Sequence, residues 1–246
     1  MSYYRTLLIE TISPYLANLI AYYPFNSDAN DFSGNSYNGT LVGTGITFTA
    51  GTVGNAINFP NNSNLVGVTI PDNDDFSFTN GTNDLPFSIS IWTNVTAFSL
   101  SLNPIFRKLA TSNYEYQLYL NRLGGIFFVK YGLLSISSTQ TISSANGLVT
   151  TGVKNHIVIT NSGGLISGIN IYFNGILLTS VTRTSAGSYT RMANGIALPS
   201  FNDSLATANF KFRGWMNEAY IWKNREITAV EALDIYNKGN SGQTLI

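Results

Sequence analysis

Side chains that commonly act in catalysis are scarce in this chain of 246 residues. It contains one histidine, His156, and no cysteine, which excludes disulfides, thiol catalysis, zinc fingers and iron–sulfur clusters. A Ser-His-Asp device needs a poised serine and an orienting acid, and no local pattern marks either one near His156. We therefore expect a structural role for His156, and we expect neither a catalytic residue nor an organic cofactor.

Paired carboxylates would point to glycoside hydrolysis, which needs two of them about 5–5.5 Å apart for retention or about 6.5–9.5 Å apart for inversion. Asp72, Asp74 and Asp75 lie close together in the sequence, but such a run of Asn and Asp is typical of a solvated turn. Glu226 and Glu231 flank and cap a predicted helix. No carboxylate pair is marked, so a hydrolase is the least favoured function.

Aromatic and amide side chains are abundant instead, with 14 Tyr, 15 Phe and 3 Trp. Sugar rings stack on exposed aromatic faces while amides bond their hydroxyl groups, so this composition suits carbohydrate. Aromatic enrichment also marks protein interfaces, and the sequence leaves both alternatives open. Trp92 is expected in the core. Tyr119 and Tyr131 are expected on solvent-facing sides of strands, with Asn121 and Arg122 near the same hairpin.

Charged residues make up only 11% of the chain, against roughly 25% in an ordinary soluble domain, and the formal net charge is zero. A zero balance argues against nucleic-acid binding and against an acidic-membrane patch, since both need clustered Lys and Arg. It also removes charge repulsion between copies, so we expect an oligomer. No segment approaches the ~18 apolar residues of a membrane span, and the N-terminus lacks the cleavage site of a signal peptide.

Short β-runs separated by turn residues fill most of the chain. Residues 87–92 and 114–121 show the period-two alternation of half-buried strands. Gly124-Gly125 and Asn174-Gly175 are hairpin signals, and Asn-Gly favours a type I′ turn. The sequence therefore predicts an all-β sandwich or jelly roll, with further strands at residues 126–131, 156–160, 169–173, 176–181 and 210–222.

Residues 1–16 differ from the rest because their apolar side chains recur at helical spacing. Pro14 should end this helix, since the residue before a proline avoids the α region. We predict an N-terminal arm over residues 1–16 and one domain over residues 17–246. The arm either packs back on its own domain or docks on another protein. Its spacing is formed by Tyr4, Leu7, Leu8, Thr11, Ile12 and Tyr15.

One short helix is predicted near the C-terminus. Thr228 and Glu231 form a Thr-x-x-Glu capping box at its start, and Gly239 is expected just after its end. The expected packing residues are Ile227 and Ala232 at the staple positions, with Val230, Leu233 and Tyr236 along one apolar stripe.

Six short motifs follow one another between residues 19 and 239. They are residues 19–25 with 28–40 (LIAYYPF, then DANDFSGNSYNGT), 54–59 (GNAINF), 86–92 (PFSISIW), 155–159 (NHIVI), 171–175 (IYFNG) and 214–231 (GWMNEAYIWKNREITAVE). Together they resemble laminin-G-like domains of the concanavalin A-like lectin and glucanase superfamily. The resemblance implies two packed antiparallel sheets in a jelly roll.

Members of that family often hold one calcium ion between the early Asp-rich loop and the closing strand, so the resemblance implies a structural calcium ion here. The closing strand carries Asn217 where the family has Asp, which keeps an oxygen and loses a charge, so the affinity should fall. The loop pattern at residues 31–35 is also that of an ordinary Asx-turn. The implied ligands are Asp28, Asp31, Asn35, Asn38, Asn217 and Glu218.

The favoured hypothesis is a non-enzymatic accessory structural protein on a virion surface, such as a decoration, fibre or tail component. Residues 1–16 would attach it to other virion proteins, and its lectin-like domain would bind glycan or the host cell surface. This rests on analogy, since bacteriophage particles carry domains of this fold. The alternative is a secreted or cell-surface carbohydrate-binding adhesin module. A glycoside hydrolase is less favoured because the Glu-x-Asp-x-x-Glu strand of the related β-glucanases is absent.

Overall fold

The computed structural model of this chain describes residues 13–60, 66–109, 114–133, 135–202 and 210–246. Most of the predicted arm, residues 1–12, lies outside this part of the chain. Its last residues are described: a 3₁₀ turn, η1 (Pro14–Leu16), buries Tyr15. Ser13 donates a hydrogen bond to the Leu245 carbonyl, so residues 13–16 pack on their own domain.

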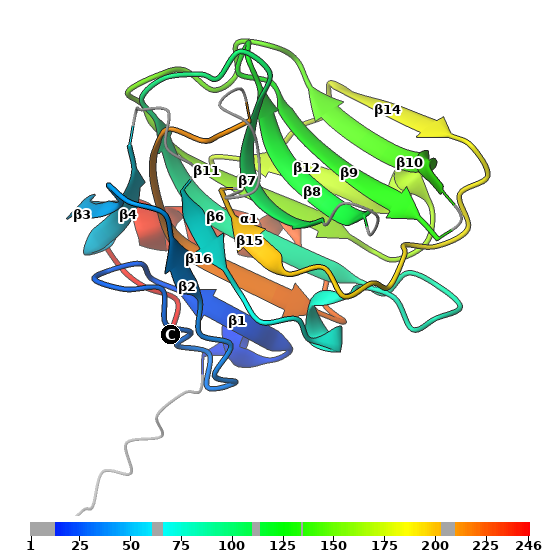
Figure 1. The fold of residues 1–246 in the computed structure, drawn as a ribbon, viewed down its shortest axis with the longest axis horizontal. Helices are drawn as coiled ribbons and strands as arrows, with labels where there is room; N and C mark the ends of the chain where they lie inside the picture. Colours follow the sequence, from blue (N-terminus) through cyan, green and yellow to red (C-terminus); the bar gives the residue numbers. More distant parts are fainter. Residues whose placement is uncertain (1–12, 61–65, 110–113, 134, 203–209) are drawn as a thin grey trace, which may run out of the picture.

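Two antiparallel sheets of eight strands each pack face to face, which confirms the predicted jelly-roll sandwich (Figure 1). In the first sheet the order is β13-β12-β11-β6-β16-β4-β3, and β1 also pairs with β16. In the second sheet the order is β14-β10-β9-β8-β7-β15-β5-β2. The first sheet contains β1 (Leu19–Tyr23), β3 (Thr47–Ala50), β4 (Asn55–Phe59), β6 (Phe87–Val95), β11 (Lys154–Asn161), β12 (Ile169–Phe173), β13 (Ile176–Leu177) and β16 (Gly214–Lys223). The second contains β2 (Thr40–Val42), β5 (Gly67–Thr69), β7 (Leu102–Leu109), β8 (Tyr114–Asn121), β9 (Ile126–Gly132), β10 (Ser135–Ser144), β14 (Val181–Ala186) and β15 (Pro199–Phe201).

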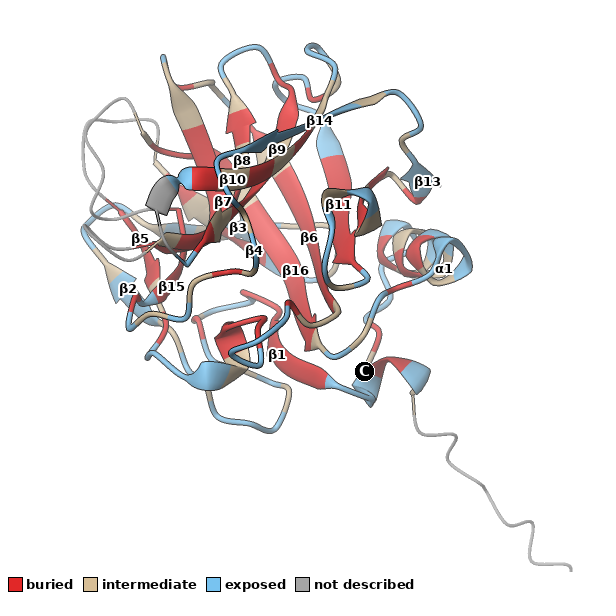
Figure 2. Cartoon of the chain, turned by 90° about the vertical axis from the view of Figure 1, so that its right-hand side faces the viewer, coloured by how far each residue is buried: buried red, intermediate tan, exposed pale blue. Residues whose placement is uncertain are grey.

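The main core lies between the sheets, where alternate residues of each strand point inward. On β6, Ile89 and Ile91 face this core, and on β8, Leu118 and Leu120 face it from the other side. The alternation of residues 87–92 predicts a half-buried strand, but β6 is buried on both faces along almost its whole length (Figure 2). The reason is that a helix covers the outer face of the first sheet.

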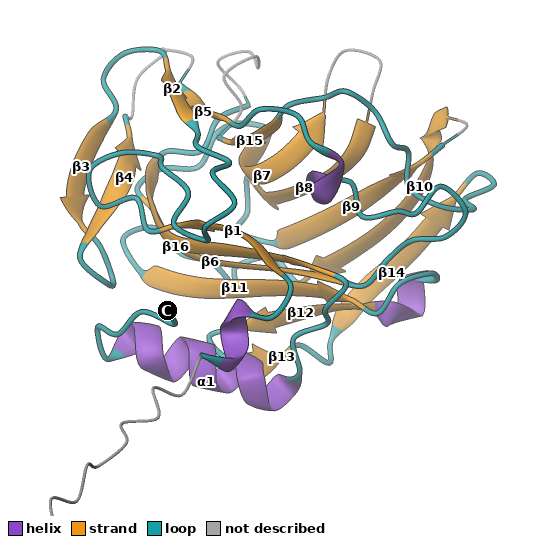
Figure 3. Cartoon of the chain, turned by 90° about the horizontal axis from the view of Figure 1, so that it is seen from below, coloured by secondary structure: helices purple, strands orange, loops and turns teal. Residues whose placement is uncertain are grey.

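That helix is α1 (Ala229–Asn240), which lies against the first sheet on the side away from the second (Figure 3). The predicted capping box is present, since Thr228 accepts from the backbone N–H of Glu231 and Glu231 accepts from that of Thr228. A second, smaller core lies beneath the helix and includes the predicted staple residues. Its members are Tyr15, Leu19, Tyr22, Val158, Tyr172, Tyr220, Trp222, Ile227, Ala232, Ile235 and Leu245.

The predicted apolar stripe of this helix is correct only for Tyr236, which packs on Trp92 and His156 of the first sheet. Val230 is 80% exposed and Leu233 is 45% exposed, whereas Ala232, Ile235 and Gly239 face the sheet. Gly239 does not end the helix as predicted, because it lies inside the last turn against a tryptophan of β6. The buried side of the helix therefore includes Tyr236 of the predicted stripe but not Val230 or Leu233.

Two predicted strands also have different bounds. Residues 176–181 do not form one strand, because the chain crosses from β13 in the first sheet to β14 in the second between Leu177 and Val181. The closing strand begins at Gly214 rather than at residue 210. The Gly214 backbone has φ 128° and lies against the Asn94 carbonyl, where a Cβ would be 1.9 Å from the oxygen, so only glycine fits.

Two buried lysines close one end of the sandwich. Lys108 donates to Ser77, Glu115 and the Gly195 carbonyl and pairs with Asp72 at 3.0 Å. Lys130 pairs with Asp84 at 2.7 Å, and both side chains are fully buried. These pairs tie the 72–84 loop and the segment around residue 195 to strands of the second sheet.

Candidate functional site

The outward face of strands β7–β10 carries a group of half-buried aromatic side chains. On β9, Ile126 and Phe128 face the core, so Phe127, Val129 and Tyr131 face outward. On β8, inward Leu118 and Leu120 leave Gln117 and Tyr119 outward by the same rule. The prediction that Tyr119 and Tyr131 lie on solvent-facing sides therefore agrees with the structure.

A β-bulge adds a further aromatic ring that alternation would place inward. Lys108 opposes Tyr116 and Leu109 opposes Tyr114, so Glu115 is the extra residue between two pairs. Glu115 turns into the buried network of Lys108, at 2.5 Å from its ammonium nitrogen. Tyr114 is consequently on the outward side, where its ring contacts the ring of Tyr131.

We call these residues the aromatic face. It contains two cross-strand ring pairs, one at each end of the β8–β9 ladder. Tyr114 and Tyr131 have centroids 5.3 Å apart with planes at 49°, and Tyr119 and Phe127 stack at 5.2 Å with planes at 16°. Between the pairs lie Gln117, whose amide donates to the Tyr131 hydroxyl, and Arg107, Val129 and Thr141 in register with it.

The charges on this face favour a neutral ligand that forms hydrogen bonds and that contacts the cation of Arg107 at one point. Burial raises the pKa of Tyr119 and of Tyr131 to about 12, so both hydroxyls stay protonated at neutral pH. Burial lowers the pKa of Arg107 to about 10, which leaves it charged. Glu115 is the one carboxylate within strands β7–β10 as the structure describes them, and it points into the Lys108 network.

Asn121 ends β8 and Arg122 follows it at the hairpin turn. The Asn121 side chain accepts from the backbone N–H groups of Leu123 and Gly125 and donates to Asn146, so it holds the hairpin turn. Arg122 is exposed at the same turn. Sequence reasoning missed Tyr114, Phe127, Gln117 and Arg107. Phe127 was within reach, because the alternation of residues 126–131 already places it beside Tyr131.

His156 has the structural role that the sequence predicts. It is fully buried on β11 beneath α1, its Nε2 lies 2.8 Å from the Ser90 hydroxyl, and its ring contacts Trp92 and Tyr236. Burial lowers its pKa to about 3, so it is neutral at physiological pH. Trp92 is buried as expected, but on the helix side of its sheet rather than between the sheets.

The loop residues implied as calcium ligands are engaged as backbone caps. The Asp31 carboxylate accepts from the N–H groups of Tyr22, Ser33 and Tyr37 and from the Ser33 hydroxyl. Asp28 accepts from Asn30, and Asn38 accepts from the N–H of Asp31. Asn35 donates its amide to the carbonyls of residues 19 and 20. This is the Asx-turn alternative, extended into a network.

The Asn217 side chain lies among backbone groups of two loops. Its amide nitrogen donates to the carbonyls of Pro24, Val53 and Asn55 at 2.7, 3.1 and 2.7 Å. Its oxygen accepts from two backbone N–H groups of the 52–53 turn. The amide therefore uses both its donor and its acceptor character, and an aspartate there could not donate.

Glu218 lies apart from that cluster, at a β-bulge with φ 51°. Its carboxylate accepts from the hydroxyls of Tyr22 and Tyr220, whose rings stack at 4.3 Å, and Thr244 of the C-terminal tail bonds both hydroxyls. Burial raises the pKa of Glu218, and these hydrogen bonds partly oppose the rise. Among the described residues, no group of three or more His, Asp or Glu side chains could hold a metal ion. The six residues do not fit a shared calcium site.

The acidic run at residues 72–75 is held in place by hydrogen bonds and one ion pair. Asp74 begins the 3₁₀ turn η2 (Asp74–Phe76), and Asp75 accepts from the Tyr37 hydroxyl at 2.6 Å. Asp72, Asn73 and Asp74 are exposed, as the predicted solvated turn requires, and Asp72 also pairs with buried Lys108 at 3.0 Å. These contacts hold the loop over the end of the sandwich.

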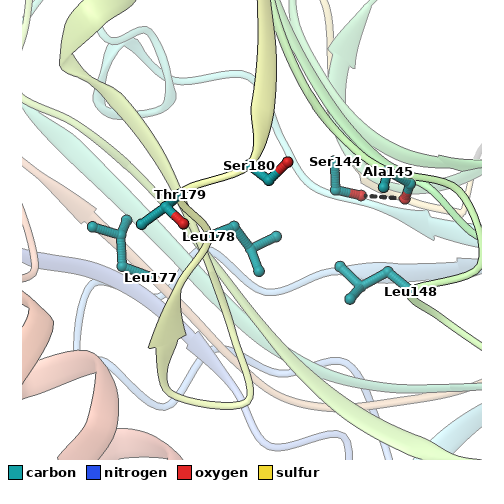
Figure 4. Close-up of a pocket in the computed structure, with 7 residues that line it drawn as sticks. All are labelled: Ser144, Ala145, Leu148, Leu177, Leu178, Thr179 and Ser180. Atoms are coloured by element: carbon teal, nitrogen blue, oxygen red, sulfur yellow. Dashed lines mark hydrogen bonds between the residues drawn. The ribbon is translucent and has the colours of Figure 1, made fainter.

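A separate shallow cavity of about 250 Å³ lies where β10 ends and the chain crosses between the sheets (Figure 4). It is lined by Leu148, Leu177 and Leu178 and by small side chains, and none of its lining residues is titratable. The lining residues are Ser144, Ala145, Leu148, Leu177, Leu178, Thr179 and Ser180. It offers apolar contact and hydroxyl groups but no acid–base chemistry.

Comparison with known structures supports the fold. Domain 4 of AbnA, a GH43 extracellular arabinanase from Geobacillus stearothermophilus, solved in complex with arabinotriose, is 18% identical with a TM-score of 0.60. The match covers 89% of this chain and 98% of that one. The botulinum neurotoxin serotype D/C binding domain is 16% identical with a TM-score of 0.66, over 91% of this chain and 53% of that one.

A third neighbour is the binding domain of botulinum neurotoxin DC in complex with SialylT, at 15% identity and a TM-score of 0.63, covering 91% of this chain and 52% of that chain. This chain therefore spans about half the length of the toxin binding domains. No curated protein sequence matches the chain. None of the helices among the described residues has the length and hydropathy needed to cross a bilayer.

The sequence itself matches a laminin G family model, described as Concanavalin A-like lectin/glucanases superfamily, over residues 62–231. Most strands of both sheets fall within this range. The chain belongs to this laminin G branch of the concanavalin A-like lectin and glucanase superfamily.

Proposed function

We propose that the chain is a non-enzymatic carbohydrate-binding protein and that the aromatic face is its glycan site. The observation that supports this most is the pairing of Tyr114 with Tyr131 and of Tyr119 with Phe127 on one outward sheet face. Aromatic rings provide apolar stacking surface, and Gln117 and Arg107 between them provide polar contacts. The arabinotriose complex of the arabinanase domain gives a precedent for sugar binding by this fold.

The absence of an enzymatic role is part of the proposal. Glycoside hydrolysis needs one carboxylic acid and one carboxylate beside the scissile bond. On the described strands beneath the aromatic face the one candidate is Glu115, which the buried Lys108 holds away from that face. The hydroxyls of Tyr119 and Tyr131, with a pKa of about 12, are poor acids and bases near pH 7.

A glycan array on the purified protein tests the binding proposal, with Tyr131→Ala and Tyr119→Ala as site variants. Phe32→Ala is the matched control, because Phe32 is 58% exposed and lies outside the aromatic face. We expect the wild-type protein and the control to bind the same glycans, and each site variant to lose at least about tenfold in affinity. Binding that both site variants retain in full would place the site elsewhere.

We further propose that the chain is an accessory structural protein of a virus particle, displayed on the particle surface in several copies. One geometric relationship favours a display role. Residues 13–16 are fixed beside α1, since Tyr15 donates to Asp234 and its carbonyl accepts from the Trp222 indole. Figure 3 shows α1 on the outer side of the first sheet, whereas the aromatic face is on the outer side of the second sheet, so η1 and the aromatic face lie on opposite sides of the sandwich.

Attachment on the side of η1 would leave the aromatic face directed away from the particle. Weak binding per site would be multiplied by copy number. Mass spectrometry and immuno-electron microscopy of purified particles test this role, together with a chain lacking residues 1–12. We expect the shortened chain to fold and bind glycan but not to join the particle. Normal incorporation of the shortened chain would refute attachment through this segment, and a protein found only in the medium would favour a secreted adhesin.

A further inference from the structure

The spacing of the two ring pairs on the aromatic face sets a minimum length for the ligand. Phe127 and Tyr131 are four residues apart on the same strand, and a strand rises about 3.3 Å per residue, so the pairs are about 13 Å apart. A linked pyranose unit advances a chain by about 5 Å, the span of a few covalent bonds of about 1.5 Å. A single ring or a disaccharide cannot reach both pairs.

The surroundings of the pairs favour a ligand that lies along the strands. Both pairs are built from β8 and β9 only. On the neighbouring strand β10, the residues in register with Phe127, Val129 and Tyr131 are Ser143, Thr141 and Thr139. These small hydroxyl side chains leave room beside the rings along the whole length between the two pairs, and they supply donors and acceptors for sugar hydroxyls.

The surface midway between the two ring pairs is polar. Gln117 and Arg107 face each other across β8 and β7, midway between the ring pairs. The Gln117 amide nitrogen donates to the Tyr131 hydroxyl, which fixes the orientation of the Gln117 side chain. A ligand that touches both aromatic ends therefore crosses a polar middle, as the alternating apolar faces and hydroxyl edges of an oligosaccharide require.

We infer that the aromatic face binds a linear stretch of oligosaccharide, at least three to four rings long, laid along β8–β10 with one ring pair under each end. This inference rests on the proposed carbohydrate-binding function and specifies its ligand class. It excludes a site that reads a single terminal sugar.

Isothermal titration with linear oligosaccharides of one to six units tests the length requirement. The probes are arabino-, xylo-, cello- and α-1,4-gluco-oligosaccharides, and the series with the strongest binding is followed. We expect affinity to rise by roughly tenfold or more between two and four units and then to level off. Tyr131→Ala and Tyr119→Ala should each weaken binding of the tetrasaccharide, and neither should abolish the weak binding of the disaccharide.

The failures of the two proposals are distinguishable. If no series and no arrayed glycan binds, the carbohydrate-binding function itself is refuted, and the length inference with it. If the monosaccharide binds as tightly as the tetrasaccharide, or if only one ring pair affects the tetrasaccharide, the protein binds carbohydrate but the two-pair site is refuted. The control variant Phe32→Ala should have the same affinity as the wild type for every oligosaccharide tested.

Discussion

Gly239 lies directly against the indole of Trp92, and this contact fixes how α1 sits on the first sheet. A Cβ at position 239 would be 2.5 Å from Nε1 and 2.9 Å from Cε2 of Trp92. The same indole stacks on Tyr236, one turn earlier, at 5.5 Å. The helix therefore approaches the sheet at the one residue that has no side chain.

Replacing Gly239 with alanine should destabilise the protein in spite of the better helix propensity of alanine. Alanine gains about 1 kcal/mol in an open helix, but overpacking against a buried ring costs about 1–3 kcal/mol or more. We expect a net loss of about 1–2 kcal/mol. Urea unfolding of Gly239→Ala measures it, with Asn240→Ala at the exposed next position as control. A stabilised Gly239→Ala protein would show that the helix can move off Trp92 without cost.

This contact also shows why part of the helix could not be predicted. The capping box of Thr228 and Glu231 is a local pattern, and its prediction is confirmed. Which stripe faces inward depends on the partner, and Trp92 is 147 positions away in the sequence from Gly239. A glycine near the end of a helical pattern looks like a stop signal until that distant ring is placed beneath it.

The aromatic face, like the helix, could be predicted from the sequence only in part. Alternation is enough to place Tyr119 and Tyr131 outward, since each is flanked by residues that face the core. Tyr114 was out of reach, because the extra residue Glu115 reverses its side of the sheet and nothing local marks that bulge. Buried Lys108, which draws Glu115 inward, is on another strand.

The Lys130–Asp84 pair supplies a second prediction. Both side chains are fully buried at 2.7 Å, and Asp84 also accepts from Tyr189 and from the Met192 N–H. Lys130→Met should cost about 3–5 kcal/mol, because it leaves a buried carboxylate without its cation. The double variant Lys130→Met with Asp84→Asn should lose less than the sum of the two single variants. Chemical unfolding of all four proteins gives the coupling, and strict additivity would refute it.

Neutral, buried His156 predicts a loss of stability in acid. Its folded pKa is about 3, below the unfolded value of about 6.5, so between these values only the unfolded chain binds the proton. The stability is fully present above about pH 6.5 and falls as the pH drops toward 3, by about 2–3 kcal/mol between pH 6.5 and 4.5.

The matched variant is His156→Gln, which cannot titrate and keeps a polar group near the Ser90 hydroxyl. Its unfolding free energy should depend less on pH than that of the wild type, by about one proton over this interval. Urea unfolding at several pH values measures both slopes. Identical slopes would show that another group controls the acid transition.

The amide of Asn217 leads to the last prediction. Three backbone carbonyls, those of Pro24, Val53 and Asn55, lie within 3.1 Å of its nitrogen and accept its hydrogen bonds. Calcium binds carbonyl and carboxylate oxygens, so the same cluster with an aspartate in place of the amide resembles a calcium site. Wild-type protein should therefore show the same Tm in calcium and in EDTA.

The Tm of the Asn217→Asp variant should, in contrast, depend on calcium. Without calcium the new carboxylate faces three carbonyls and can donate to none of them, so the variant should lose about 2–3 kcal/mol. Added calcium should restore part of the loss, because a ligand at 100 times its Kd stabilises by about 2.7 kcal/mol. Thermal unfolding in calcium, magnesium and EDTA checks both proteins, with Asn217→Ala as the variant that lacks donor and ligand alike. A calcium-dependent Tm in the wild type would show that its ion site lies elsewhere, and calcium rescue of Asn217→Ala would show that the carbonyls bind the ion without a carboxylate.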